Sequence, residues 1–237
     1  MSTSGHRLAD APIPRLGPLT WRDVAAVRPI LLVPLGSTEQ HGPHLPLDTD
    51  TRIAVAVAER AAAMVGAVVA VAPPVTYGAS GEHAGFVGTL SIGTDALASV
   101  LVELARSADH FAGVIWVCAH GGNDAALDAA AATLDADGRS AVTFWCGIDG
   151  GDAHAGRTET SMMLAIAPEA VRLDDAEAGD LRPWREIKDE VRAGGVRAVS
   201  PNGVLGDPAG ASADEGERIV SGIVARLVDV VARCLDD

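Results

Sequence analysis

The sequence predicts an α/β fold in which a mostly parallel central sheet is covered by helices on both faces. Short apolar runs alternate along the chain with stretches long enough for helices, and this alternation is typical of parallel βαβ units. The runs are almost continuously apolar, as expected for strands buried on both faces. With 237 residues, 48% of them hydrophobic, the chain can bury a sizeable core, and we expect one domain over residues 1–237.

Each predicted element follows from its own pattern. Residues 1–20 carry three prolines and no clear period, which indicates an N-terminal arm. The predicted strands are 30–35, 68–72, 114–118 and 141–146, and the predicted helices between them lie at about 51–65, 94–110 and 123–137. Apolar residues at helical spacing over 212–235, after a capping box of Ser212 and Glu215, predict a C-terminal helix that covers the core. The weaker pattern around 174–195 is typical of a lid or an oligomer contact.

The composition excludes several classes of function. A formal net charge of −14 argues against binding to nucleic acid or anionic membranes, because both need basic patches. The N-terminus has no signal-peptide pattern, and no apolar stretch reaches the ~18 residues that span a membrane. Cys118, Cys146 and Cys234 show no CxxC spacing, so we expect buried thiols in a reducing compartment. The expected protein is soluble and cytoplasmic.

A dense polar segment, residues 36–50, directly follows the first predicted strand and holds two histidines and three carboxylates. Glu39 and His41 are two residues apart, so in an extended segment both side chains leave the same face of the backbone. Asp50 follows after enough chain to return toward them. Carboxylate and imidazole together suit zinc, iron(II) or manganese. We interpret the segment as half of a metal centre; the alternative is a hydrogen-bonded loop.

Polar clusters also follow two later strands. His120 and two glycines come directly after the strand at 114–118, and His154 and Glu159 follow the strand at 141–146. Because the carboxyl ends of parallel strands meet at one edge of a sheet, we expect these side chains to join the first cluster in an active site. Each has an alternative: His120 as a hydrogen-bonded loop histidine, and Glu159 as a capping residue or dipole partner at the start of a helix.

Other residues near the same edge have simpler interpretations. Glu82 and His83, after the second strand, are candidates for substrate binding. Asn123 is expected to cap the helix that follows His120. The chain has no GxSxG, P-loop or GxGxxG motif, so serine-hydrolase, phosphoryl-transfer and dinucleotide-binding functions have no support in the sequence.

As a set, these motifs resemble the creatininase family. The matching segments are 36–46 with Asp50, 88–91, 120–123, and 154–156 with 159–161. The resemblance implies a three-layer αβα fold with a mostly parallel sheet. It also implies a homo-oligomer, hexameric or similar, and one or two divalent ions that are used to hydrolyse unusual amide C–N bonds.

The resemblance also implies roles for particular residues. Carried over by position, Glu39, His41, Asp50 and His120 are metal ligands. Asp50 bridges if two ions bind, and Glu159 completes the second site. The resemblance therefore implies a centre for Zn²⁺, Fe²⁺ or Mn²⁺ that is built from five side chains.

The chain departs from creatininase at Gly122, where that enzyme has a glutamate ligand, so creatinine is not the expected substrate. The segments 48–54, 151–161 and 199–208 resemble a subfamily of peptidases that cut a radical-modified precursor peptide ahead of its C-terminal Val–Tyr-derived unit, in the biosynthesis of a redox cofactor. In such a reaction we expect Glu159, or a nearby carboxylate, to accept a proton from the attacking water and His154 to protonate the departing amine.

Two alternatives stay open at the level of the sequence. One is another amidohydrolase of the same family, acting on a formamidopyrimidine or a cyclic amide. The other is a non-catalytic, metal-stabilised scaffold protein of a biosynthetic complex. Metal-dependent release of a product distinguishes the enzymes from the scaffold, and a comparison of substrates distinguishes the enzymes from each other.

Overall fold

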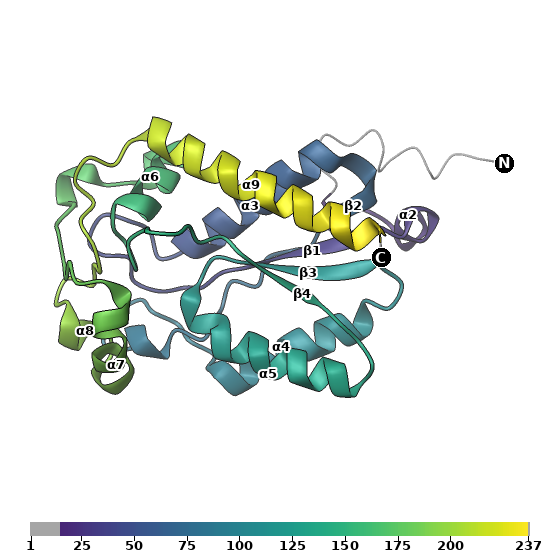
Figure 1. The fold of residues 1–237 in the computed structure, drawn as a ribbon, viewed down its shortest axis with the longest axis horizontal. Helices are drawn as coiled ribbons and strands as arrows, with labels where there is room; N and C mark the ends of the chain where they lie inside the picture. The colour runs from purple at the N-terminus through teal and green to yellow at the C-terminus, as the bar shows by residue number, and fades with distance from the viewer. Residues whose placement is uncertain (1–14, 237) are drawn as a thin grey trace.

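A parallel sheet lies at the centre of the computed structural model (Figure 1), which describes residues 15–236. The strand order is β2-β1-β3-β4, and every neighbouring pair is parallel. The strands are β1 (Ile30–Leu35), β2 (Val69–Val71), β3 (Gly113–Cys118) and β4 (Val142–Trp145). The four predicted strands are confirmed, and their ends differ from the prediction by at most one residue.

Helices cover both faces of this sheet, so the predicted three-layer α/β fold is confirmed (Figure 1). One face carries α3 (Thr49–Val65), α6 (Arg157–Ile166) and α9 (Ala213–Asp236), and the other carries α4 (Thr94–Ser107) and α5 (Asp124–Ala136). The remaining helices are α2 (Trp21–Val27), α7 (Trp184–Gly194) and α8 (Val196–Val199). Short 3-10 turns are η1 (Gly66–Val68), η2 (Gly81–His83), η3 (Gly121–Asn123), η4 (Pro168–Ala170) and η5 (Leu173–Asp175).

The alternation of side chains along β1 explains why the run had to be apolar throughout. Ile30 and Leu32 point into the core under α3 and α9, whereas Leu31, Val33 and Leu35 point into the core under α4 and α5. All five are buried. A polar residue at any of these positions would lie inside one of the two cores, so the strand carries no polar side chain.

The C-terminal helix begins as expected, but only half of the predicted capping box forms. The Ser212 hydroxyl accepts a hydrogen bond from the Glu215 backbone N–H at 3.3 Å. The Glu215 carboxylate does not return to the cap; it accepts instead from Arg157 Nε at 2.8 Å and Ser161 Oγ at 3.2 Å. Glu215 therefore ties the start of α9 to α6.

The segment 174–195, expected to be a lid or an oligomer contact, contains α7 and ends at Gly195, which leads directly into α8. These two helices share a small apolar cluster of their own, formed by Ile187, Val191, Val196 and Leu205. Gly195 lies against η2: it has a φ of +75°, and a Cβ there would come within 2.9 Å of the Glu82 carbonyl oxygen. The α7–α8 pair thus packs against the loop after β2, beside the edge where the strands end (Figure 1).

The N-terminal arm lies mostly outside the described residues. At the start of the described residues, the Leu16 backbone N–H donates a hydrogen bond to the Val71 carbonyl at 2.8 Å, so this segment lies beside β2. Across residues 15–236, no helix has the length and apolarity needed to cross a membrane.

Candidate metal centre

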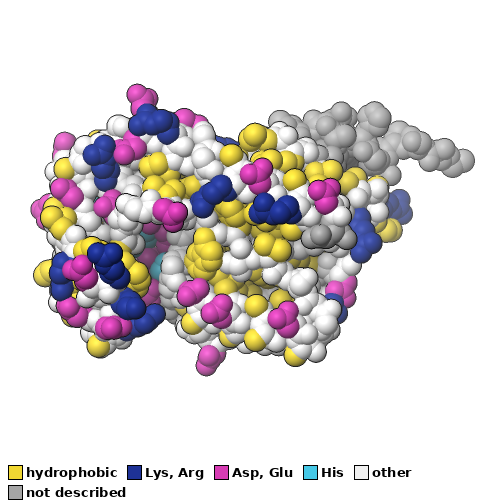
Figure 2. All heavy atoms as spheres, in the orientation of Figure 1, with side chains coloured by type: hydrophobic (Ala, Val, Ile, Leu, Met, Phe, Trp, Pro, Cys, Tyr) yellow, Lys and Arg dark blue, Asp and Glu magenta, His cyan; other side chains and the backbone are white. Residues whose placement is uncertain are grey.

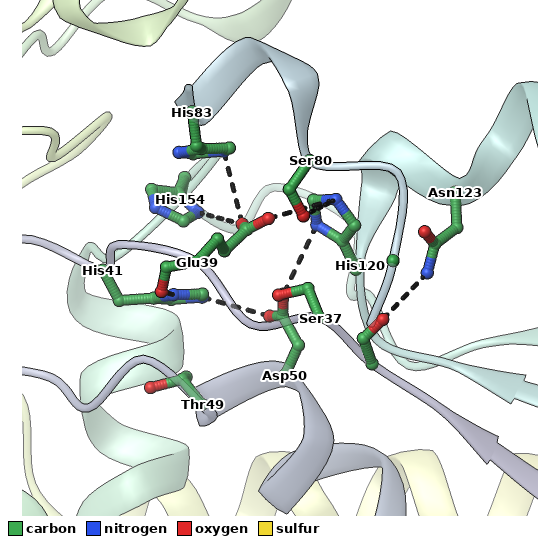
Figure 3. Close-up of polar contacts among 12 residues, drawn as sticks. Ser37, Glu39, His41, Thr49, Asp50, Ser80, His83, His120, Asn123 and His154 are labelled. Atoms are coloured by element: carbon green, nitrogen blue, oxygen red, sulfur yellow. Dashed lines mark hydrogen bonds and ion pairs between the residues drawn. The ribbon is translucent and has the colours of Figure 1, made fainter. Parts of the chain in front are cut away.

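The loops that follow the strands bring the predicted residues together at one edge of the sheet (Figure 3). Glu39 and His41 lie in the loop after β1, and Asp50 lies in the first turn of α3. His120 is the residue before η3, and His154 lies in the loop between β4 and α6. All five side chains are buried. The expected convergence of loops therefore occurs.

Asp50 lies between two of the histidines. Its Oδ1 is 3.1 Å from His41 Nε2, and its Oδ2 is 3.3 Å from His120 Nδ1. Ser37 Oγ donates to Oδ2 at 2.7 Å. Each carboxylate oxygen thus faces a different ring, which is the arrangement a carboxylate needs to bridge two ions.

Glu39 is the most deeply buried acid of the cluster. Its Oε2 lies 3.2 Å from His120 Nε2, and its Oε1 lies 3.3 Å from His83 Nε2 and 3.8 Å from His154 Nδ1. Among the described residues, neither oxygen has a hydrogen-bond partner of acceptable geometry. A buried carboxylate without hydrogen bonds is costly, so the surroundings of Glu39 fit a bound cation.

Glu159 approaches the same nitrogen of His41 that faces Asp50. Its Oε2 is 3.9 Å from His41 Nε2 and accepts a hydrogen bond from the Ala155 backbone N–H at 2.5 Å. The His41 and His154 rings are tilted, with centroids 4.2 Å apart. Glu159 can therefore both cap the start of α6 and belong to the metal centre. It accepts a hydrogen bond from the backbone near the start of that helix and also lies close to His41.

Three sets of side chains have potential ligand atoms within 4.8 Å of one another. These sets are Glu39–Asp50–His120, His41–His154–Glu159 and Glu39–His83–His154. The first two contain only residues that the sequence singled out. His83 was expected to line the cleft, and the sequence did not indicate that its ring would meet Glu39; the only signal was its position next to another polar residue after a strand.

The ionisable side chains of the cluster shift one another's pKa values. Burial raises the pKa of Glu39 to about 7. Burial alone would lower the pKa of His41 and His120, but Asp50 beside His41 and Glu39 beside His120 outweigh it and raise both pKa values to about 10. The two rings are thus cationic at neutral pH. In spite of burial, His41 holds the pKa of Asp50 well below its usual range.

The other two histidines behave in the opposite way. Burial lowers the pKa of His83 to about 3 and that of His154 well below its ordinary value, and the positive charge of the neighbouring rings acts in the same direction. His154 Nε2 donates to the Gln40 carbonyl at 2.9 Å, which leaves the unprotonated Nδ1 facing Glu39. A neutral ring with one nitrogen fixed by a backbone carbonyl is suited to metal binding or to proton transfer at the other nitrogen.

Asn123 does not cap α5 with its side chain, contrary to the prediction. Its Oδ1 accepts from the Ala79 N–H at 2.9 Å, and its Nδ2 donates to the Gly36 carbonyl at 3.1 Å. The amide therefore joins the loops after β1, β2 and β3, which is a long-range role that local sequence patterns do not reveal.

The cluster lies at the floor of a cleft of about 1000 Å³. The walls come from η2, from Trp145 and the loop after β4, and from the α7–α8 pair, with Trp184 and Arg192 at the rim. Figure 2 shows this hollow, with histidine and acidic side chains visible inside it. Glu82 and His83 both line the cleft, as expected for residues near a substrate.

A parallel sheet with buried histidines and carboxylates at its strand ends, open to a large cleft, is typical of α/β hydrolases that bind divalent metal ions. The sequence model of the creatininase family, described as creatinine amidohydrolase, matches residues 18–231. The chain belongs to the creatininase family. It is accordingly an amidohydrolase or peptidase that acts on C–N bonds, which argues against the non-catalytic scaffold.

Individual relatives refine this comparison. A mycofactocin precursor peptide peptidase from Mycolicibacterium smegmatis is 49% identical over 242 residues, which cover 100% of this chain and 98% of that protein. The crystal structure of a creatinine amidohydrolase has a TM-score of 0.77 at 24% identity and covers 94% of this chain and 98% of its own. A mutant creatininase described as Zn-Zn type has a TM-score of 0.74 at 23% identity and covers 93% and 98%.

The resemblance expected from the sequence is therefore confirmed at both levels. The family is the creatininase family, and the subfamily expected from the segments 48–54, 151–161 and 199–208 is that of the mycofactocin precursor peptide peptidases. The two creatininase structures support the fold alone, because their identity to this chain is below 25%.

Proposed function

We propose that this protein is a divalent-metal-dependent peptidase that cleaves the radical-modified mycofactocin precursor peptide ahead of its C-terminal Val–Tyr-derived unit. The full-length similarity to a peptidase of that name supports the choice of substrate. The observation that carries the metal dependence is Glu39, a fully buried carboxylate without a hydrogen-bond partner among the described residues, surrounded by three imidazoles.

The proposed ligands form two adjoining sets. Glu39, Asp50 and His120 would hold one ion, and His41 with Glu159 would hold a second, with Asp50 shared between them because each of its oxygens faces one set. Nitrogen and carboxylate donors of this kind suit Zn²⁺, Fe²⁺ or Mn²⁺. We further propose a cytoplasmic homo-oligomer, hexameric or similar, as the resemblance implies.

The bound metal ion, Glu159 and His154 have different roles in the proposed reaction. A bound divalent cation supplies Lewis-acid polarisation of the scissile carbonyl and makes a nearby water more acidic. Glu159, whose pKa is raised by burial, accepts the proton of the attacking water. His154 is neutral at rest because burial lowers its pKa. It receives the water proton from Glu159, with which it shares a set of side-chain atoms within 4.8 Å of one another, and delivers that proton to the departing amine.

The test begins with protein purified without added metal. Elemental analysis gives the native ion, and cleavage is then followed with the modified precursor peptide, a formamidopyrimidine and creatinine side by side. We expect a single cut in the modified peptide, its loss after chelation, and its return on addition of one kind of divalent ion.

Two variants sharpen the test. Glu39→Gln keeps the shape of the side chain and removes its charge, and it should lose both bound metal and cleavage. Asp48→Asn changes a half-buried acid that precedes α3 and pairs with Arg52 at 2.8 Å, and it should retain both. Turnover of the formamidopyrimidine or creatinine in preference to the peptide would contradict the proposed substrate, and cleavage that survives chelation would contradict the metal dependence.

A further inference from the structure

We infer that Glu82 is a further carboxylate of the metal centre and that it positions the His120 ring for metal binding. Gly122 is the residue that leaves room for the Glu82 side chain. The inference rests on the metal centre proposed above and adds one functional residue to it. Glu82 is thereby a positioning residue of the centre instead of a substrate contact alone.

The first argument is the environment of the His120 ring. Its Nδ1 faces Asp50 at 3.3 Å, and its Nε2 lies 3.6 Å from Glu82 Oε1. A histidine that binds a metal through one nitrogen commonly donates the N–H of the other to a carboxylate or a carbonyl, which fixes the ring and raises its basicity. Nε2 also lies 3.3 Å from Ser80 Oγ, 3.4 Å from the Ala79 carbonyl oxygen and 3.2 Å from Glu39 Oε2. Among these groups, Glu82 is the acid that approaches from the open cleft.

The second argument is the space above Gly122. A Cβ at this position would overlap Glu82 Oε1 and His120 Nε2 and would lie 2.6 Å from the Ala79 carbonyl oxygen. Gly122 does not have a positive φ, so its backbone conformation is open to other residues, and glycine is required for space alone. The volume that a side chain at 122 would fill is shared by the Glu82 carboxylate, the His120 ring and the Ala79 carbonyl.

The third argument is that Glu82 is otherwise unpaired. Within residues 15–236, the only ion-pair partner of its carboxylate is His120, whereas many other acids of the surface pair with an arginine. Its side chain is 27% exposed and faces the cleft. The backbone of η2 is held from behind by Gly195, which leaves little room for the loop to withdraw.

The charge balance of the site also supports the inclusion of Glu82 in the metal centre. Glu39, Asp50 and Glu159 bring three negative charges to the cluster, and two divalent ions would bring four positive charges. Glu82 supplies the fourth negative charge at the side of the cluster that faces the cleft. Since burial makes uncompensated charge costly, a fourth carboxylate favours occupation of the full site.

The experiment measures metal binding and requires no substrate. Metal-free wild-type protein, Glu82→Gln and Asp124→Asn are titrated with Co²⁺ in competition with a chromophoric chelator, and the visible absorption of the bound Co²⁺ and the stoichiometry are recorded. Asp124 also lines the cleft and has no contact with His120 among the described ion pairs, so it is the matched control. Glu82→Gln keeps the size of the side chain, and thermal unfolding of the metal-free proteins checks that all three are folded.

We expect Glu82→Gln to weaken Co²⁺ binding by about 10- to 100-fold, as is typical when the partner of a ligating histidine is lost, and to alter the absorption spectrum. Asp124→Asn should stay within about twofold of wild type. Gly122→Ala should also weaken Co²⁺ binding, because the added methyl group would overlap both Glu82 Oε1 and His120 Nε2; Glu82→Gln is the variant that isolates the carboxylate.

Wild-type affinity, stoichiometry and spectrum in a folded Glu82→Gln protein overturn the inference. This failure differs from a failure of the proposed function. If wild-type protein binds Co²⁺ but does not cleave the modified peptide, the proposed peptidase function is refuted, whereas the role of Glu82 in metal binding is unaffected. Conversely, cleavage by the wild type together with unchanged Co²⁺ binding in Glu82→Gln refutes only the inference about Glu82.

Discussion

Loading the metal centre at pH 8 should displace about two protons from each chain. His41 and His120 have pKa values of about 10 in the metal-free protein, so both rings are almost fully protonated at pH 8. A ring nitrogen must be unprotonated to bind a metal, and each of these rings therefore gives up about one proton. Glu39, with a pKa of about 7, is already mostly ionised and contributes about 0.1 proton.

The sign and size of the pH dependence follow from this count. The metal-free form holds protons that the loaded form lacks, so metal affinity rises as the pH rises from about 7 to about 10. Two protons make the affinity change about 100-fold per pH unit, or about 2.7 kcal/mol. Above pH 10 the rings are neutral without metal, and the dependence should level off.

Calorimetric titration with Mn²⁺ in two buffers of different ionisation heat measures the number of protons directly. The variant His110→Ala removes an exposed histidine that is not part of the cluster and should still release about two protons, whereas His41→Ala should release about one. Release of fewer than about 0.5 proton by the wild type at pH 8, or an affinity that does not change between pH 7 and 9, would refute the charge assignment on which the site is argued.

Three further predictions concern single side chains and stability. His154→Ala should lower turnover of the modified peptide by about 10²- to 10⁴-fold with a much smaller change in metal content; equal loss of both would make it a ligand. Gly36→Ala should destabilise the protein by about 1–3 kcal/mol in denaturant unfolding, because its Cβ would come within 2.5 Å of the Thr51 backbone. Gly113→Ala, with open space around it, is the control, and equal effects would contradict the packing argument. Metal-free protein should lose stability in thermal scans from pH 7 to pH 10, since the two cationic histidines are protonated in the folded chain and neutral in the unfolded one; stability that rises with pH would contradict the raised pKa values.

Much of the fold could be predicted because burial on both faces leaves a simple pattern. A strand such as Ile30–Leu35 sends alternate residues into two different cores, so it must be apolar at every position, and such a run is visible in the sequence. The grouping of Glu39, His41, Asp50, His120 and His154 could be predicted by the same logic, because parallel strands deliver their following loops to one edge.

The parts that could not be predicted depend on contacts between distant segments. Asn123 directly follows the two glycines after His120, as a helix cap would, but its amide binds Gly36 and Ala79. Gly122 could be recognised as the absence of a glutamate, yet the sequence does not show that Glu82, forty residues earlier, approaches the same space. Contacts of this kind join loops that are distant in the sequence. They produce no local sequence pattern, and only the three-dimensional structure shows them.

The separate apolar cluster under α7 and α8 has a consequence for how the enzyme can adapt to its substrate. Ile187, Val191, Val196 and Leu205 pack with one another and not within the two cores of the sheet. This cluster is nevertheless joined to the floor of the cleft, because Leu205 exchanges backbone hydrogen bonds with His154 and Gly195 packs against the backbone of Glu82. A substitution in this wall that changes the choice of substrate should therefore also shift His154 or Glu82, so selectivity and catalysis are expected to change together.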